Sequence, residues 1–231
     1  MNIIRNEKLI KRNQRIAQIA TFGSLIIFAG TFIISYRYPD QMFLWLSTLT
    51  VGFLISQIGI FFTNRFGPKT RADLKLDLAL KGLDKKYTLY HYSSPARHLL
   101  IGPAGIWILL PYFQGGTITY SKGRYKQRGG NFYMKIFAQE SLGRPELEMS
   151  SELDTFEKYF KKHASDFELP PINTLLVFTN PKAVIDISEE DSPPAVALPA
   201  VKLKDFFRKT AKSDNLSMEK VTQIQELFPQ K

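Results

Sequence analysis

The residues best suited to chemistry in this chain lie in one basic and aromatic stretch. Cationic and aromatic side chains are interleaved there, and they are Lys122, Arg124, Tyr125, Lys126, Arg128, Phe132, Tyr133 and Lys135. Cations contact phosphates and aromatic rings stack on unpaired bases, so the stretch suits single-stranded nucleic acid. The same cations suit anionic lipid headgroups. A solvated hairpin with basic outer positions is the third interpretation, and the sequence leaves all three open.

Other catalytic or metal-binding patterns are weak. The chain has no cysteine, which excludes disulfides, thiolate zinc sites and cysteine nucleophiles. His91 and His98 lie close in sequence without a nearby carboxylate, so we expect two strand histidines and no metal site. The segment Gly102–Gly105 lacks the Gly-Lys-Ser/Thr ending of a phosphate-binding loop. We therefore expect no cofactor.

Two long uncharged segments precede this part of the chain. Residues 16–35 and 42–63 carry no charged side chain, and each is close to the ~20 residues that a helix needs to cross a bilayer. A signal peptide is a poor alternative, because Tyr36–Asp40 is no small-residue cleavage site and a second span follows at once. We expect a transmembrane helical hairpin, in which small residues four apart favour close helix contact: Ala20, Ser24, Thr48, Gly52 and Ser56.

The charges that flank these segments predict their orientation. Only Arg37 and Asp40 lie in the loop between the two spans. The basic residues gather at the outer ends instead, at Arg5, Lys8, Lys11, Arg12 and Arg15 before the first span and at Arg65, Lys69, Arg71 and Lys75 after the second. The positive-inside rule then places both termini in the cytoplasm of a multi-pass protein of the cell (inner) membrane. Residues 1–15 form a basic cytoplasmic N-terminus in this prediction.

Residues 64–231 are expected to form one cytoplasmic domain. Of the net charge of +10, they carry +6, since 25 of the 31 basic and 19 of the 21 acidic residues lie there. Apolar periodicity and turn residues predict helices over 73–83, 145–163, 203–212 and 217–228. They predict strands over 87–92, 98–101, 106–110, 117–120, 125–128 and 173–179, and a proline-rich loop over 188–199. The fold class is therefore α/β.

Three sequence segments resemble the NERD (nuclease-related) domain family. They are His-Leu-Leu-Ile-Gly-Pro-Ala-Gly-Ile-Trp-Ile-Leu at 98–109, Gly-Gly-Thr-Ile at 115–118 and Leu-Val-Phe-Thr-Asn-Pro at 176–181. The resemblance covers roughly 71–212. It implies a restriction-endonuclease-like PD-(D/E)xK fold, with a central mixed β-sheet flanked by helices.

The resemblance does not extend to the catalytic motif. The family's first acidic position falls on Arg97, and its Glu-x-Lys triplet falls on Leu110, Pro111 and Tyr112. Moreover, no Asp or Glu lies between Asp84 and Glu140. A Mg²⁺-dependent hydrolase holds its cation with carboxylates. We therefore expect a fold that has lost the family's chemistry.

These observations predict a membrane-anchored, catalytically inactive protein that acts by binding or scaffolding at the cytoplasmic membrane face. Its partners would be the bilayer, through 16–35 and 42–63, and nucleic acid or anionic headgroups. A second interpretation is a Mg²⁺-dependent nuclease acting on DNA or RNA, with acids from elsewhere such as Asp73, Asp77, Glu140 and Glu146. A third is a structural partner of another membrane protein, in a homo- or hetero-oligomer formed through the hairpin.

Overall fold

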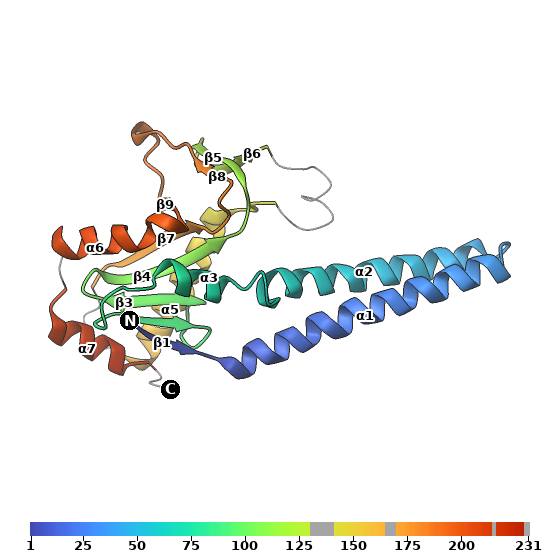
Figure 1. Ribbon diagram of the computed structural model, residues 1–231, viewed down its shortest axis with the longest axis horizontal. Coiled ribbons are helices and arrows are strands. Elements are labelled where there is room, and N and C mark those ends of the chain that lie inside the picture. Colours follow the sequence, from blue (N-terminus) through green and yellow to red (C-terminus); the bar gives the residue numbers. More distant parts are fainter. Residues whose placement is uncertain (130–140, 165–169, 214–215, 229–231) are drawn as a thin grey trace. The chain divides into compact units, whose positions relative to one another are not determined.

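The structure, a computed structural model, describes residues 1–129, 141–164, 170–213 and 216–228 (Figure 1). The chain separates into two compact units. The first unit combines Met1–Asn6 with the described residues from Ala72 onward, and the second is the segment Glu7–Arg71. The short N-terminal segment therefore belongs to the same unit as the chain that follows the hairpin.

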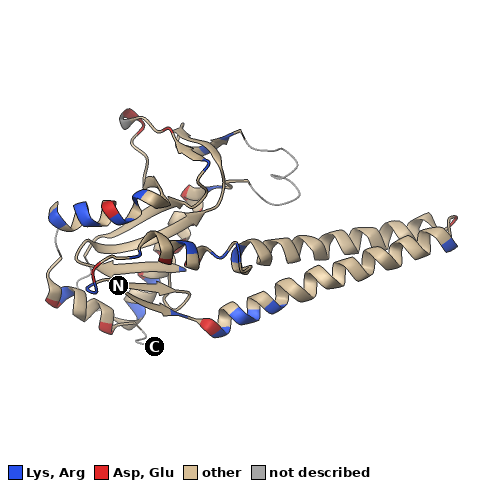
Figure 2. Ribbon diagram, in the orientation of Figure 1, with Lys and Arg blue, Asp and Glu red and all other residues tan. Residues whose placement is uncertain are grey.

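The second unit is a pair of long helices, α1 (Glu7–Arg37) and α2 (Met42–Phe66). Both are long and apolar enough to cross a membrane. Their most apolar windows are only 22% and 11% buried, which is unlike the core helix of a soluble protein. In Figure 2 most of each helix is tan, the colour of residues other than Lys, Arg, Asp and Glu.

Small residues let α1 and α2 approach closely. Ala20, Ser24 and Gly52 are buried, as the four-residue spacing predicts. A Cβ placed on Gly52 would lie 2.8 Å from Cε1 of Phe28. The Thr31 hydroxyl also lies 3.0 Å from the Thr48 hydroxyl across the pair. The predicted small-residue contact is thus made between the two helices of one hairpin.

The first unit is built on a six-stranded mixed sheet in the order β1-β2-β3-β4-β7-β9. Its strands are β1 (Asn2–Arg5), β2 (Thr88–His91), β3 (His98–Gly102), β4 (Gly105–Tyr112), β7 (Ile172–Phe178) and β9 (Val196–Pro199). The pairs β1–β2, β4–β7 and β7–β9 are parallel, whereas β2–β3 and β3–β4 are antiparallel.

Helices cover both faces of this sheet. One face packs against α5 (Pro145–His163) and α7 (Met218–Glu226) through a core that includes Phe156 and Ile224. The other face packs against α3 (Ala72–Ala79) and α6 (Leu203–Ser213) through a core that includes Leu76 and Phe207. The strands alternate accordingly, with Leu99 and Ile101 in the first core and Leu100 in the second. The architecture is α/β with a central mixed sheet, as predicted.

A second sheet of three strands, in the order β6-β5-β8, adjoins the first core. It consists of β5 (Gly116–Ser121), β6 (Arg124–Arg128) and β8 (Ala183–Ile185). Strand β5 pairs antiparallel with β6 and parallel with β8. Ile118 and Tyr125 are buried on its inner side.

The structure differs from the sequence-based predictions at four places. Residues 1–15 were expected to lie outside the domain, but Asn2–Arg5 add a strand to its sheet. The proline-rich segment 188–199, expected to be a loop, contains a short 3-10 helix (Glu189–Asp191) and β9. Strand β8 was not predicted. The helix expected to reach Leu83 ends at Ala79, ahead of the positive φ of Gly82.

Candidate functional site: a basic sheet face and two buried ionic clusters

The basic residues of β6 lie on the solvent side of the three-stranded sheet. Lys122 and Gly123 form a two-residue turn with positive φ angles of 52° and 73°, a geometry that suits the twist of a hairpin. Strand β6 then alternates, so Arg124, Lys126 and Arg128 are exposed. These three cations lie on one face of the sheet, and Lys122 lies in the turn beside them.

Hydroxyl groups of β5 complete this face. Thr117, Thr119 and Ser121 are the register partners of Arg128, Lys126 and Arg124 and therefore share their side of the sheet. The Thr119 Oγ1 is buried without a hydrogen-bond partner among the described residues.

Two residues of the β8 segment lie at the border of the face. Val184, the register partner of Thr117, is 58% exposed. Asp186 is exposed, and its backbone N–H donates to the carbonyl of Ile118. Three strand cations thus lie among hydroxyls, with an acid and an apolar side chain at one edge. We call the side of the sheet formed by Thr117, Thr119, Ser121, Arg124, Lys126, Arg128 and Val184 the basic face.

The aromatic part of the predicted site is not on this face. Tyr125 is 4% exposed, and its hydroxyl donates to the carbonyl of Ala195 at 2.6 Å. Burial is also the main reason that the pKa of Tyr125 is raised to about 12. Its ring points into the core, so the expectation that Tyr125 stacks on a base is wrong. Phe132, Tyr133 and Lys135 lie outside the described residues.

A buried ionic cluster joins β1 to α3 and to the sheet. Arg5 lies 3.3 Å from a carboxylate oxygen of Asp73 and also pairs with Asp77. The other oxygen of Asp77 lies 3.0 Å from Nε2 of His91. Nδ1 of His91 is in turn 2.8 Å from Nδ1 of His98, its register partner on β3. We call these five residues the Arg5 cluster.

The electrostatics of the Arg5 cluster follow from burial and from its hydrogen bonds. Burial alone would raise the pKa of Asp77, but the hydrogen bonds and charges of His91 and Arg5 outweigh it and lower that pKa. Burial, then His91 and Arg97, lower the pKa of His98 well below 6.5. One hydrogen joins the two Nδ1 atoms, and His91 donates Nε2–H to Asp77. The two histidines are therefore linked to a carboxylate and are not ordinary isolated strand residues.

A second cluster lies on the opposite face of the main sheet, where the family resemblance places catalytic residues. Arg97 pairs with Glu152 and lies 2.7 Å from Glu148, both on α5. The Tyr112 hydroxyl donates to Glu148 at 2.6 Å. Leu110 is buried in the core. Arg97 and Tyr112 thus both contact Glu148, by an ion pair and a hydrogen bond respectively. We call Arg97, Tyr112, Glu148 and Glu152 the Arg97 cluster.

Neither cluster resembles a metal centre. Within the described parts of the chain, no group of three or more potential metal-ligating side chains is assembled. The acids named for a displaced nuclease site are dispersed, since Asp73 and Asp77 bind Arg5 while Glu146 accepts the backbone N–H of Tyr125. Glu140 lies outside the described residues. Asp73, Asp77 and Glu146 each have a cation or a backbone donor where a metal ion would have to bind.

Comparisons of the chain with protein-family models, with curated proteins and with solved structures found no match. The function is therefore argued from the geometry of the chain itself.

Sequence reasoning missed the Arg5 cluster. Arg5 was assigned to the charges that set membrane topology, and His91 and His98 had no acid near them in sequence. The available signal was the seven-residue spacing of the two histidines across a tight β-hairpin, which makes them opposite neighbours. The parallel pairing of β1 with β2, which brings Arg5 beside His91, has no local signal.

Proposed function

We propose that this protein is a membrane-anchored, non-catalytic binding or scaffolding protein whose basic face contacts anionic lipid headgroups. The observation that supports this proposal most directly is the alternation of exposed and less exposed side chains along β6. It places Arg124, Lys126 and Arg128 together on the solvent side. The proposal has three parts: the anchor, the loss of catalysis and the contact surface.

The anchor follows from the way in which the hairpin is joined to the domain. Strand β1 and helix α3 belong to one folded unit, so the two ends of the hairpin must lie on the same side of any membrane that α1 and α2 cross. The charge bias at these ends selects the cytoplasmic side. Membership of one unit and the charge bias are independent arguments for the same topology.

The loss of catalysis is supported by the Arg97 cluster. An arginine stands where the resembled family has an acid, and it holds Glu148 and Glu152 in ion pairs. A guanidinium repels the divalent cation that such a site would need. The chain can retain an endonuclease-like architecture as a rigid support for another surface.

Short covalent connections would keep the domain near the membrane. One residue joins β1 to α1, and five join α2 to α3. The uncharged part of α1 begins at Ile16, about 14 Å along the helix from Glu7 at 1.5 Å per residue. A domain so closely tethered meets headgroups at high effective concentration.

The composition of the basic face favours lipid over nucleic acid. Tyr125 is not available as a stacking platform, which removes one of the three aromatic rings that would favour single-stranded nucleic acid. The exposed Val184 at the edge suits contact with a bilayer interface. Each basic residue near an anionic membrane surface contributes about 1 kcal/mol to the free energy of membrane binding, and salt screens this attraction.

The test uses the full chain, labelled at one introduced cysteine, Lys122→Cys, with an environment-sensitive fluorophore. The chain has no other thiol to label. In phosphatidylcholine vesicles that contain phosphatidylserine, we expect quenching by lipid-borne quenchers that is absent in pure phosphatidylcholine and is reversed by salt. Lys126→Glu combined with Arg128→Glu should abolish the quenching.

A matched variant, Lys158→Glu with Lys161→Glu, makes the same charge change on the exposed side of α5. It should leave the quenching intact. The lipid proposal fails if phosphatidylserine has no effect. If single-stranded oligonucleotide instead binds the chain in phosphatidylcholine discs, and the Lys126/Arg128 pair is needed for it, the partner is nucleic acid.

A further inference from the structure

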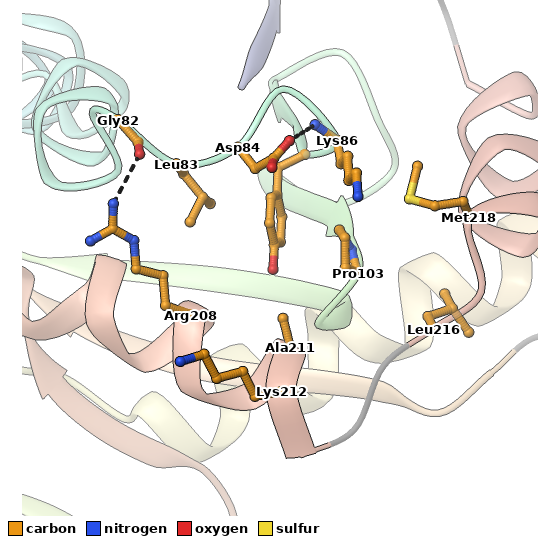
Figure 3. Close-up of a pocket in the computed structure, with 11 residues that line it drawn as sticks. Gly82, Leu83, Asp84, Lys86, Pro103, Arg208, Ala211, Lys212, Leu216 and Met218 are labelled. Atoms are coloured by element: carbon orange, nitrogen blue, oxygen red, sulfur yellow. Dashed lines mark hydrogen bonds between the residues drawn. The ribbon is translucent and has the colours of Figure 1, made fainter.

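A pocket of about 530 Å³ lies in the first unit, away from both ionic clusters and from the basic face (Figure 3). Its walls come from the turn after α3, from the β3–β4 turn, from α6 and from the start of α7. This volume is typical of small-molecule sites. The lining residues are Gly82, Leu83, Asp84, Lys86, Tyr87, Pro103, Arg208, Ala211, Lys212, Leu216 and Met218.

Cations outnumber acids at the rim of the pocket. Lys86, Arg208 and Lys212 are exposed, and among the described residues Asp84 is the only acid that lines the pocket. Within the described residues, neither Lys86 nor Lys212 forms an ion pair, while Arg208 lies 3.7 Å from the exposed Asp205. The carboxylate of Asp84 is turned toward the backbone N–H of Lys86. The rim therefore has an excess of two positive charges.

The floor and one side of the pocket are apolar. Leu83 and Tyr87 are buried beneath it, and Leu216 and Met218 form the wall toward α7. A small inorganic anion would leave most of this volume unfilled. The shape and composition suit an anionic group that carries an apolar or heterocyclic body.

Hydrogen bonds between the walls hold the pocket in its shape. Arg208 donates to the carbonyl of Gly82 at 3.3 Å, which joins α6 to the turn after α3. The N–H of Leu216 donates to the carbonyl of Pro103 at 2.8 Å. Gln225 of α7 donates to the carbonyl of Lys86 at 3.4 Å. A site whose walls are already joined loses little free energy to ordering when a ligand enters.

From this geometry we infer that the pocket binds a phosphate monoester with an apolar or heterocyclic body. A phosphate monoester carries nearly two negative charges at neutral pH, which matches the excess at the rim. Lys86 and Lys212 belong to different elements at the rim, and either ammonium group can contact the phosphate while the other adds to the positive potential. Arg208 reinforces them, and the organic body packs on Leu83 and Leu216. The inference is independent of the basic face.

The test measures calorimetric titration of the full chain in phosphatidylcholine discs. The probes are adenosine monophosphate, which represents soluble phosphate esters, and dihexanoyl phosphatidic acid, which represents lipid headgroups. We expect at least one probe to bind more tightly than inorganic phosphate. Lys86→Gln and Lys212→Gln should each weaken that binding about tenfold, as expected when a charge-assisted hydrogen bond is lost.

Matched variants separate a pocket from a diffuse charge effect. Lys85→Gln and Lys209→Gln remove neighbouring exposed lysines that do not line the pocket, and they should change binding less than twofold. Ala211→Phe should fill the pocket and abolish binding, and the midpoint of thermal unfolding checks that the variant, which also lies against the second core, remains folded. Binding of neither probe overturns the inference, as does equal affinity for inorganic phosphate or equal loss in all four lysine variants. Lys126→Glu with Arg128→Glu should leave probe binding intact, so failure here and failure of the lipid proposal are distinguishable.

Discussion

Replacing Arg5 by methionine should destabilise the domain, although Arg5 lies in the first strand of the chain and at the edge of the sheet. The substitution keeps the length of the side chain and removes the guanidinium that contacts Asp73 and Asp77. The Asp73 side chain is 1% exposed and that of Asp77 is 16% exposed, so water cannot replace the lost partner well. Breaking a buried ion pair by removing one member costs about 3–5 kcal/mol.

We expect the lower end of that range, about 3 kcal/mol, because Asp77 keeps its hydrogen bond to His91. For a domain of this size, each 1 kcal/mol lost from the free energy of unfolding lowers the midpoint of thermal unfolding by about 2–4 °C. The midpoint should therefore fall by about 6–12 °C. Arg5→Lys keeps the charge but cannot span both carboxylates, and it should lose about half as much. The control Lys85→Met, on an exposed loop, should change the midpoint little.

The pH dependence gives a second readout of the same variant. The pKa of Asp77 is lowered in the folded state from 3.8, so its contribution to stability is present above about pH 4 and is lost as the pH falls through the folded pKa. The difference in the midpoint of thermal unfolding between wild type and Arg5→Met should therefore become smaller below about pH 4. An unchanged unfolding midpoint at neutral pH, or a difference that widens in acid, would refute this reasoning.

Three further substitutions test the rest of the structure. The pKa of buried His98 is lowered from 6.5, so the unfolded chain takes up a proton first and stability should fall below about pH 6.5, by up to about 1.4 kcal/mol per pH unit. Urea unfolding of His98→Asn should show this decline flattened, and an equally steep decline would contradict the assignment. Tyr112→Phe removes the hydroxyl that binds Glu148 and should cost about 1.5 kcal/mol in the same assay, whereas no loss would mean that this hydrogen bond is unimportant. In the hairpin, Gly52→Leu meets Phe28 and should lower the unfolding midpoint in detergent, while Gly30→Leu, with no heavy atom within 4 Å, should not; similar effects of both would argue against the close contact of α1 and α2.

The elements with strong local signals were predicted closely. The helix over 145–163 has its predicted bounds, because the proline at its start, early acids and late lysines mark both ends. The strands predicted over 98–101 and 106–110 are β3 and β4, which pair with each other. The second strand extends beyond its predicted end to Tyr112, so Pro111 lies inside it. It is tolerated there because β3 pairs with β4 only as far as Ile108.

The features that were missed depend on contacts distant in sequence. Asn2–Arg5 were predicted to be part of a basic N-terminus outside the domain. They form a strand because they pair with β2, which lies more than 80 residues away in the sequence. Strands β8 and β9 are short and lie in a proline-rich segment, where local composition favours a loop. The acids of the Arg97 cluster come from α5. This helix lies outside the acid-free stretch between Asp84 and Glu140, from which the loss of catalytic carboxylates was predicted. The three exposed cations of β6, by contrast, follow from alternation alone.

The central claim concerns topology. The chain segments before and after the membrane hairpin belong to one folded domain, and we propose that this domain lies in the cytoplasm. Because the chain has no cysteine, single thiols at Lys8, Asp40 and Glu219 can be probed with a membrane-impermeant maleimide in intact and permeabilised cells. We expect Asp40→Cys to be labelled in intact cells, and Lys8→Cys and Glu219→Cys to be labelled only after permeabilisation. Labelling of Lys8→Cys and Glu219→Cys from opposite sides of the membrane, or protection of Asp40→Cys in intact cells, would contradict the account.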